Sequence, residues 1–397
     1  MRGIVFICAL ISVIVPSLAF SAGQDEASPG CVQSVFGTDR AAVIKACTMA
    51  LQQSGLSDET RAGLLKLRAW AQYQSQNIDA AVQDLDAALT ITPKDLALLV
   101  RRGMAAIHKR EFDPRPVEPA KLLTAALYAK QALSIDPNYW GAYDLLGMTG
   151  TAGGSLEIAK AAFDRAIELR PNDAFVHTHR LYFCKHFYLF DEGLKELEAL
   201  SRLPDRELDT TPVTIHNKEM SVRTMIRLER ASVLERMGRF EEAEKAYADW
   251  VNVEPGAISY AWSADFHFRR TKFEVTQAEL DKSFSYDSKF WYPHNTQGNL
   301  YFYTNQHERA VASFTLAISD FPETGMNYWG RALALRALQR NDEATADGLK
   351  AIEDPELQLR IIKRVTKSGY LKINASTADQ LAALRDAVRA CMLDEGC

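Results

Sequence analysis

Three histidines and a cysteine stand close together in the middle of the chain, and their side chains are of kinds that bind metal ions. They are His177, His179, Cys184 and His186. In a helix, residues seven apart share a face, so His177 lies with Cys184 and His179 lies with His186. A metal site needs three or four donors that converge, with a further partner fixing each imidazole. Two pairs on different faces do not meet this requirement, so packed or surface histidines are the favoured interpretation and no metal ligand is assigned.

The glycine-rich stretch 147–155 has the composition of a loop that cradles phosphate. Such a loop follows a strand and carries a lysine at a fixed offset, and neither condition is met here, so Gly153 and Gly154 are predicted to form a turn between two helices. The sequence also lacks the GxSxG, HExxH and CxxC motifs and a supported Cys/His pair. Glu241 and Glu242 stand at a predicted helix start, where the helix dipole favours solvated carboxylates. We therefore predict no enzymatic activity, no catalytic residue and no cofactor.

Composition and charge exclude several classes of protein. The 397 residues are 47% hydrophobic and 24% charged, which excludes collagen-like and wholly disordered chains. Lysine and arginine number 46 against 51 aspartate and glutamate, a net charge of −5. Because no global basic field exists to neutralise a phosphate backbone, we expect no nucleic-acid partner.

The first residues have the three zones of a secretory signal peptide. Arg2 precedes an apolar run over residues 4–15, and the small-residue sequence that ends at Ala19 follows. We predict cleavage after Ala19, with Ala22 as the alternative. No later segment is long and apolar enough to span a bilayer, so no membrane span is expected after cleavage. The short signal favours the bacterial periplasm, although eukaryotic export remains open.

The cysteines fit an exported chain, because oxidising compartments allow disulfides to persist. Cys31 and Cys47 bracket the first mature segment, and Cys391 and Cys397 bracket the end of the chain. Two terminal disulfides are predicted from this placement, each closing an end that would otherwise fray. Unpaired buried thiols are the alternative. Cys184 is left over and is interpreted as a small apolar helix residue.

Helical patterns end at prolines whose spacing is often close to 34 residues. These prolines are Pro93, Pro137, Pro171, Pro255, Pro322 and Pro355. One clear copy of the repeated pattern comprises Tyr143, Leu146, Gly147, Ala159, Phe163, Ala166 and Pro171, and another comprises Gly298, Tyr301, Ala310, Phe314, Ala317 and Pro322. Small residues allow two helices to cross closely, aromatic residues fill the space beside them, and proline ends the second helix.

From about residue 58 to residue 355, three-quarters of its length, the chain resembles tetratricopeptide-repeat proteins. The resemblance implies an all-α fold, a right-handed superhelical solenoid of stacked helix hairpins, because one hairpin cannot bury its own apolar face. It also implies an adaptor role. Asn299 falls where family members that clamp a peptide carboxylate carry an asparagine, but the basic companions of that clamp are not assembled around it.

Departures from the repeat predict the domain boundaries. An excess of residues between Pro93 and Pro137 predicts a protruding loop, and a degenerate copy before residue 201 predicts a break in the array. The predicted segments are a signal peptide (1–19), a disulfide-stapled helical cap (20–57), an N-terminal repeat block (58–200), an irregular linker (201–221), a C-terminal repeat block (222–355) and a C-terminal helical cap (356–397).

Stacked hairpins place one face of each first helix along a concave groove. Counting positions along these helices predicts a partner-binding groove lined by Trp70, Tyr73, Met104, Met148, Tyr182, Trp262, Asp265, Phe268, Arg269, Tyr292, Asn295, Asn299, Tyr303, Trp329 and Arg336. Aromatic rings with adaptable polar neighbours are typical of partner-binding surfaces. The alternative is that many of these rings pack between repeats.

The sequence therefore predicts a non-catalytic scaffold of the bacterial periplasm that binds a protein or peptide in this groove. An accessory or regulatory subunit associated with the cell wall is the second hypothesis, and a hydrolase without a known motif is the third. Association of two copies into a homo-oligomer is left open.

Overall fold

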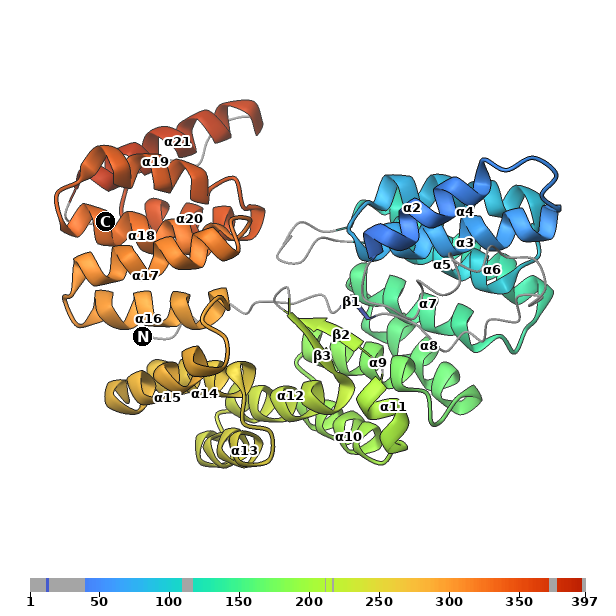
Figure 1. The fold of residues 1–397 in the computed structure, drawn as a ribbon, viewed down its shortest axis with the longest axis horizontal. Coiled ribbons are helices and arrows are strands. Elements are labelled where there is room, and N and C mark those ends of the chain that lie inside the picture. Colours follow the sequence, from blue (N-terminus) through green and yellow to red (C-terminus); the bar gives the residue numbers. More distant parts are fainter. Residues whose placement is uncertain are drawn as a thin grey trace. The chain divides into compact units, whose positions relative to one another are not determined.

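The computed structural model describes residues 12–13, 40–108, 117–210, 212–215, 218–370 and 377–394, and helices dominate these residues (Figure 1). The helices are α2 Arg40–Leu51, α3 Asp58–Gln74, α4 Ile78–Ile91, α5 Leu96–Ala106, α6 Pro119–Ile135, α7 Trp140–Ala152, α8 Leu156–Leu169, α9 Ala174–His186, α10 Phe190–Ser201, α11 Asp205–Thr210, α12 Val222–Arg236, α13 Phe240–Val253, α14 Ala257–Arg269, α15 Phe273–Tyr286, α16 Trp291–Tyr303, α17 His307–Asp320, α18 Gly325–Ala337, α19 Asn341–Ala351, α20 Pro355–Lys367 and α21 Thr377–Leu393. The strands are β1 Ser12–Val13, β2 Pro212–Ile215 and β3 Lys218–Ser221.

The described chain divides into two compact units, with the boundary inside α12 between Ile226 and Arg227. We call them the N-terminal unit and the C-terminal unit. In each unit, consecutive helices pack as antiparallel hairpins, such as α7 with α8 and α16 with α17 (Figure 1). The predicted all-α fold of stacked hairpins is thus confirmed.

Small residues let the two helices of a hairpin cross closely, as the repeat pattern predicts. A Cβ atom added to Gly147 would lie 2.7 Å from the ring of Phe163, and one added to Gly298 would lie 2.8 Å from the ring of Phe314. Both rings are fully buried. A larger side chain at either glycine would force the helices apart, because a close-packed interior has no room to absorb it.

The turns between paired helices share one backbone conformation. Gly154 and Gly238 have positive φ, and so do the corresponding Thr271 and Asn305 of later hairpins. Each turn is closed by a backbone bond of the Schellman type, such as the 2.9 Å bond from the Lys272 N–H to the His267 carbonyl. The predicted turn at Gly153 and Gly154 is confirmed.

The Thr271→Gly variant is expected to be more stable by about 0.5–1 kcal/mol. A β-branched residue is strained at a φ of 58°, whereas glycine adopts this region freely. The gain is limited because glycine also widens the unfolded ensemble. Urea unfolding checks the result, and Asn305→Gly should gain less because asparagine tolerates this conformation. Equal gains at both positions would argue against strain at Thr271.

The first helices of neighbouring hairpins lie closer together than the second helices. In the C-terminal unit α16 contacts both α14 and α18, and in the N-terminal unit α7 contacts both α5 and α9. Among the described residues, the second helices of neighbouring hairpins do not approach to the same extent. Each stack therefore curves with its first helices inside, and we call that side of each unit its inner surface.

Residues 201–221, predicted as an irregular linker, instead contain the short helix α11 and an antiparallel sheet. β2 pairs with β3 in the register Val213 to Met220, and β1 pairs with β2 in the register Val13 to Val213. The sequence Val213, Thr214 and Ile215 explains the correction, because β-branched residues favour strands. Apart from Ser12 and Val13, the predicted signal peptide lies outside the described residues.

Helices at both ends pack onto the repeats. α2 packs on α3 through a cluster that includes Cys47, and α21 packs on α19 through a cluster that includes Cys391. Both cysteines are in disulfides, and Cys184 is a free buried thiol. The predicted partners Cys31 and Cys397 lie outside the described residues, so the pairing stays a prediction. Among the described helices, none has the length and apolar character needed to cross a membrane.

Candidate functional site

The inner surface of the C-terminal unit carries one exposed and three half-buried aromatic and amide side chains. Trp262 and Phe268 come from α14, and Asn299 and Tyr303 come from α16. Tyr303 is 67% exposed, and the other three are half-buried. The rings of Phe268 and Tyr303 meet edge to face with centroids 5.6 Å apart. We call these four residues the aromatic patch.

A chain of carboxamides runs from the aromatic patch into the protein. The Asn299 Nδ2 donates to the Asn295 Oδ1 at 3.1 Å, and the Asn295 Nδ2 donates to the Asn327 Oδ1 at 2.7 Å. Asn327 is fully buried and its Nδ2 has no hydrogen-bond partner. These bonds fix the orientation of the Asn299 carboxamide. Its Oδ1 and the second N–H of its Nδ2 remain available to bond with a ligand. Asn327 was not among the predicted site residues, because the count along α18 did not include its position.

Asp265 and Arg269, both predicted groove residues, belong to an ionic network. The Arg269 Nη2 lies 2.8 Å from the Glu235 Oε2, and Arg269 also pairs with Asp265. The Tyr292 hydroxyl donates to the Asp265 Oδ2 at 2.8 Å. Burial opposes the charge of Arg269, but Glu235 raises the pKa of the guanidinium above its usual value. These groups hold α14 against its neighbours.

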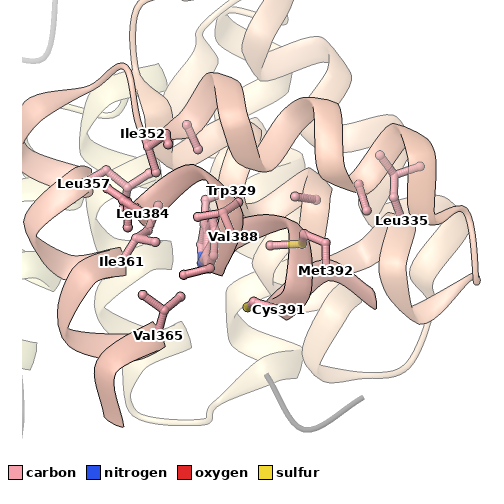
Figure 2. Packing of buried hydrophobic residues seen from close by; sticks show 14 residues of the cluster. Trp329, Leu335, Ile352, Leu357, Ile361, Val365, Leu384, Val388, Cys391 and Met392 are labelled. Atoms are coloured by element: carbon pink, nitrogen blue, oxygen red, sulfur yellow. The ribbon is translucent and has the colours of Figure 1, made fainter. Parts of the chain in front are cut away.

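The structure corrects the prediction for Trp329 and Arg336. Trp329 is 9% exposed and lies in the cluster that α20 and α21 complete, beside Val388 and Met392 (Figure 2). The Arg336 Nη1 donates to the Cys391 carbonyl at 3.5 Å. α21 covers this end of the inner surface, so neither residue contributes to an open groove. Tyr292 and Asn295 are also buried.

In the N-terminal unit, the predicted groove residues pack largely between helices. Trp70 packs on the cluster beneath α2, and Met104 and Met148 pack on the cluster between α5, α6 and α7. The Tyr73 hydroxyl bonds with the His108 Nδ1 at 3.0 Å, and burial raises the pKa of Tyr73 to about 12. Tyr182 is half-buried, with its ring 6.4 Å from that of His186. The structure therefore does not gather these residues into one patch.

His177 and His179 of α9 are held by carboxylates. The His177 Nδ1 lies 2.6 Å from the Glu196 Oε2, and its Nε2 lies 2.8 Å from the Pro171 carbonyl. The His179 Nδ1 lies 2.8 Å from the Asp144 Oδ2. Among the described residues, no group of three or more His, Cys, Asp or Glu side chains is placed to hold a metal ion.

We expect the protein to lose stability as the pH rises above about 6.5. Burial opposes the charge of His177, His179 and His267, but neighbouring carboxylates raise the pKa of each above its usual value. The charged pairs therefore stabilise the fold fully below the unfolded-state pKa, and this contribution is lost as the pH passes the folded-state pKa.

Urea unfolding at a series of pH values tests this expectation. The Glu279→Gln variant removes the carboxylate 2.7 Å from the His267 Nδ1, so its profile should be flatter than that of the unmodified chain. A free energy of unfolding that rises with pH over this range would contradict the prediction.

Two segments match family models described as tetratricopeptide repeat, residues 141–173 in the N-terminal unit and residues 295–356 in the C-terminal unit. Tetratricopeptide repeats are therefore present in both units. No curated protein matches this chain in sequence.

Several solved structures are similar in shape. A tetratricopeptide repeat protein from Parabacteroides merdae is 15% identical, with 77% of this chain and 96% of that chain covered and a TM-score of 0.41. A thermophilic TPR protein of Thermus thermophilus is 20% identical, with 50% and 92% covered and a TM-score of 0.36. Yeast Tom70 is 12% identical, with 91% and 94% covered and a TM-score of 0.42. Structural similarities at such low sequence identity and TM-score do not indicate what this chain binds.

Proposed function

We propose that this chain is a non-catalytic scaffold of the bacterial periplasm whose aromatic patch binds an extended segment of a partner protein. The observation that carries the proposal is that Tyr303 is 67% exposed and meets the half-buried ring of Phe268 edge to face. The inner surface that carries them also holds the half-buried Trp262 and Asn299. Tetratricopeptide repeats support a scaffold that binds other proteins.

The chemistry of the patch suits an extended peptide. Aromatic side chains offer a large contact area at a small entropic cost, and they are enriched where partners bind most tightly. The Asn299 carboxamide has one donor and one acceptor available, and a peptide bond presents the complementary acceptor and donor. The bond to Asn295 holds this amide in place before a partner arrives, which lowers the entropic cost of binding.

Selection of peptides from a displayed random library against the full chain, followed by affinity measurement, tests the site. The Trp262→Ala and Tyr303→Ala variants should each weaken binding of a selected peptide at least tenfold, as expected for central aromatic contacts. Tyr286→Ala is the matched control, because Tyr286 is 56% exposed but lies on the second helix α15. An equal loss in the control would show that the peptide binds elsewhere.

Export rests on the signal-like first residues and is tested separately. The proposal expects a periplasmic protein that begins at Phe20, with disulfides Cys31–Cys47 and Cys391–Cys397. N-terminal sequencing and non-reducing peptide mapping measure both properties. Recovery of the intact chain from the cytoplasm would contradict export. Sedimentation with cell-wall sacculi that persists in the Trp262→Ala and Tyr303→Ala variants would instead favour a wall-associated subunit.

A further inference from the structure

Asn327, the buried end of the carboxamide chain, can influence a partner only through its neighbours. It stands in the first turn of α18 and is fully buried, so a bound segment cannot reach it. Its Oδ1 accepts from the Asn295 Nδ2 at 2.7 Å, and Asn295 is itself buried. The Asn327 Nδ2 makes no hydrogen bond, so the oxygen is the atom that this chain of amides uses. Any effect of Asn327 on binding must therefore pass through Asn295.

The three carboxamides all point in one direction along the chain. Asn299 donates to Asn295 at 3.1 Å, and Asn295 donates to Asn327. In this direction Asn299 offers a partner one oxygen and one N–H. If all three amides were reversed, Asn299 would instead offer two N–H groups, with its oxygen turned inward. The acceptor at Asn327 therefore decides which groups the half-buried Asn299 presents.

The two directions suit different groups of a partner. A peptide bond within a chain has one C=O and one N–H, which complement one donor and one acceptor. A terminal carboxylate only accepts, so it would pair with two N–H groups and would be repelled by the Asn299 oxygen. The direction found in the structure thus favours an internal peptide bond.

The charges beside the aromatic patch act in the same sense. Asp265 is three residues from Trp262 and three from Phe268, so it lies between them on the surface of α14. Arg269 pairs with Asp265 and with Glu235, which leaves this group with one more negative charge than positive. The group repels an incoming carboxylate, because the guanidinium that would attract it is already engaged.

We propose that Asn327 is a positioning residue that makes the aromatic patch select an internal peptide bond of its partner over a free carboxyl terminus. Asn327 holds Asn295, and through it Asn299, in the orientation that offers one donor and one acceptor. This inference rests on the proposed function, because it specifies what the aromatic patch binds. The partner is then an extended segment with residues on both sides of the bond that Asn299 contacts.

Truncated forms of the peptide selected from the displayed library test this preference. The peptide is shortened from its carboxyl end one residue at a time, and each form is made as a C-terminal amide and as a free acid. Fluorescence anisotropy with the full chain measures both affinities. At the length where the new end reaches Asn299, the amide should bind roughly fivefold more tightly or better, the worth of one hydrogen bond. Tighter binding of the free acid, or equal affinity at every length, would overturn the proposal.

Two substitutions of Asn327 separate positioning from folding. Asn327→Leu removes the acceptor and keeps a similar volume, so the preference for the amide over the free acid should disappear. Asn327→Asp keeps an oxygen that accepts from Asn295, so the preference should persist although a buried carboxylate lowers the melting temperature. A purely structural role predicts the reverse, with the greater loss in the less stable variant. Preference retained in Asn327→Leu would show that Asn327 does not position Asn299.

Thr324→Val is the matched control. Thr324 is 2% exposed, caps the same helix α18, and its hydroxyl makes no hydrogen bond. This variant should keep both the affinity and the preference, so a loss equal to that of Asn327→Leu would attribute the effect to repacking of α18 and contradict the proposal. Trp262→Ala should weaken the amide and the free acid alike. If it weakens neither, the proposed function fails; if it weakens both but the two forms never differ, only this inference fails.

Discussion

The Phe314→Ala variant should lower the free energy of unfolding by about 3–5 kcal/mol. Phe314 is 1% exposed, and its ring fills the space left by Gly298 of α16 and Gly330 of α18. Both glycines lack the Cβ that would otherwise reach into this space. Truncating the ring therefore leaves a cavity where three helices meet, and neighbouring side chains cannot close it without moving backbone.

Urea unfolding followed by circular dichroism measures this loss. Leu316→Ala is the control, because Leu316 lies on the same helix but is 53% exposed. The control should lose less than about 1 kcal/mol, since little apolar area leaves a packed environment. If both variants lost the same amount, the stability would come from helix propensity and not from the packing of the Phe314 ring.

The hairpins were predictable because their packing is set by residues close in sequence. Gly298, Ala310 and Phe314 meet within one repeat, and their spacing alone specifies which helix faces cross. The turns were predictable only in part. A glycine such as Gly154 favours positive φ and so indicates a turn in the sequence. Thr271 also has positive φ, which threonine disfavours, because the helices on either side hold its backbone there.

The inner surface was less predictable, because position in a repeat does not say what covers it. Trp329 stands at a repeat position that was counted as part of the groove. It is buried because α21 packs over it. Whether a side chain is free depends on residues distant in sequence, such as the pairing of Asp95 with Lys66.

The Arg180→Met variant should lose about 3–5 kcal/mol of stability. Arg180 of α9 is 6% exposed and pairs with carboxylates of both adjacent second helices, Asp164 of α8 and Glu192 and Glu196 of α10. Methionine keeps much of the side-chain volume but leaves Glu196, whose side chain is only 12% exposed, with one fewer positive partner. Breaking a buried pair from one side is costly, because the remaining charge has already lost its water.

Two comparisons distinguish this account from a simple loss of charge. Arg165→Met removes the same charge from α8, but Arg165 is exposed and pairs with Glu168 at 2.9 Å, so its loss should stay below about 1 kcal/mol. In Arg180→Met, His177 is the one ion-pair partner of Glu196 left among the described residues, and it contacts Glu196 at 2.6 Å. The charge of His177 then matters more, and the variant should lose stability more steeply than the unmodified chain as the pH rises above about 6.5. Parallel pH profiles for the two chains would mean that Arg180 and His177 act on Glu196 independently.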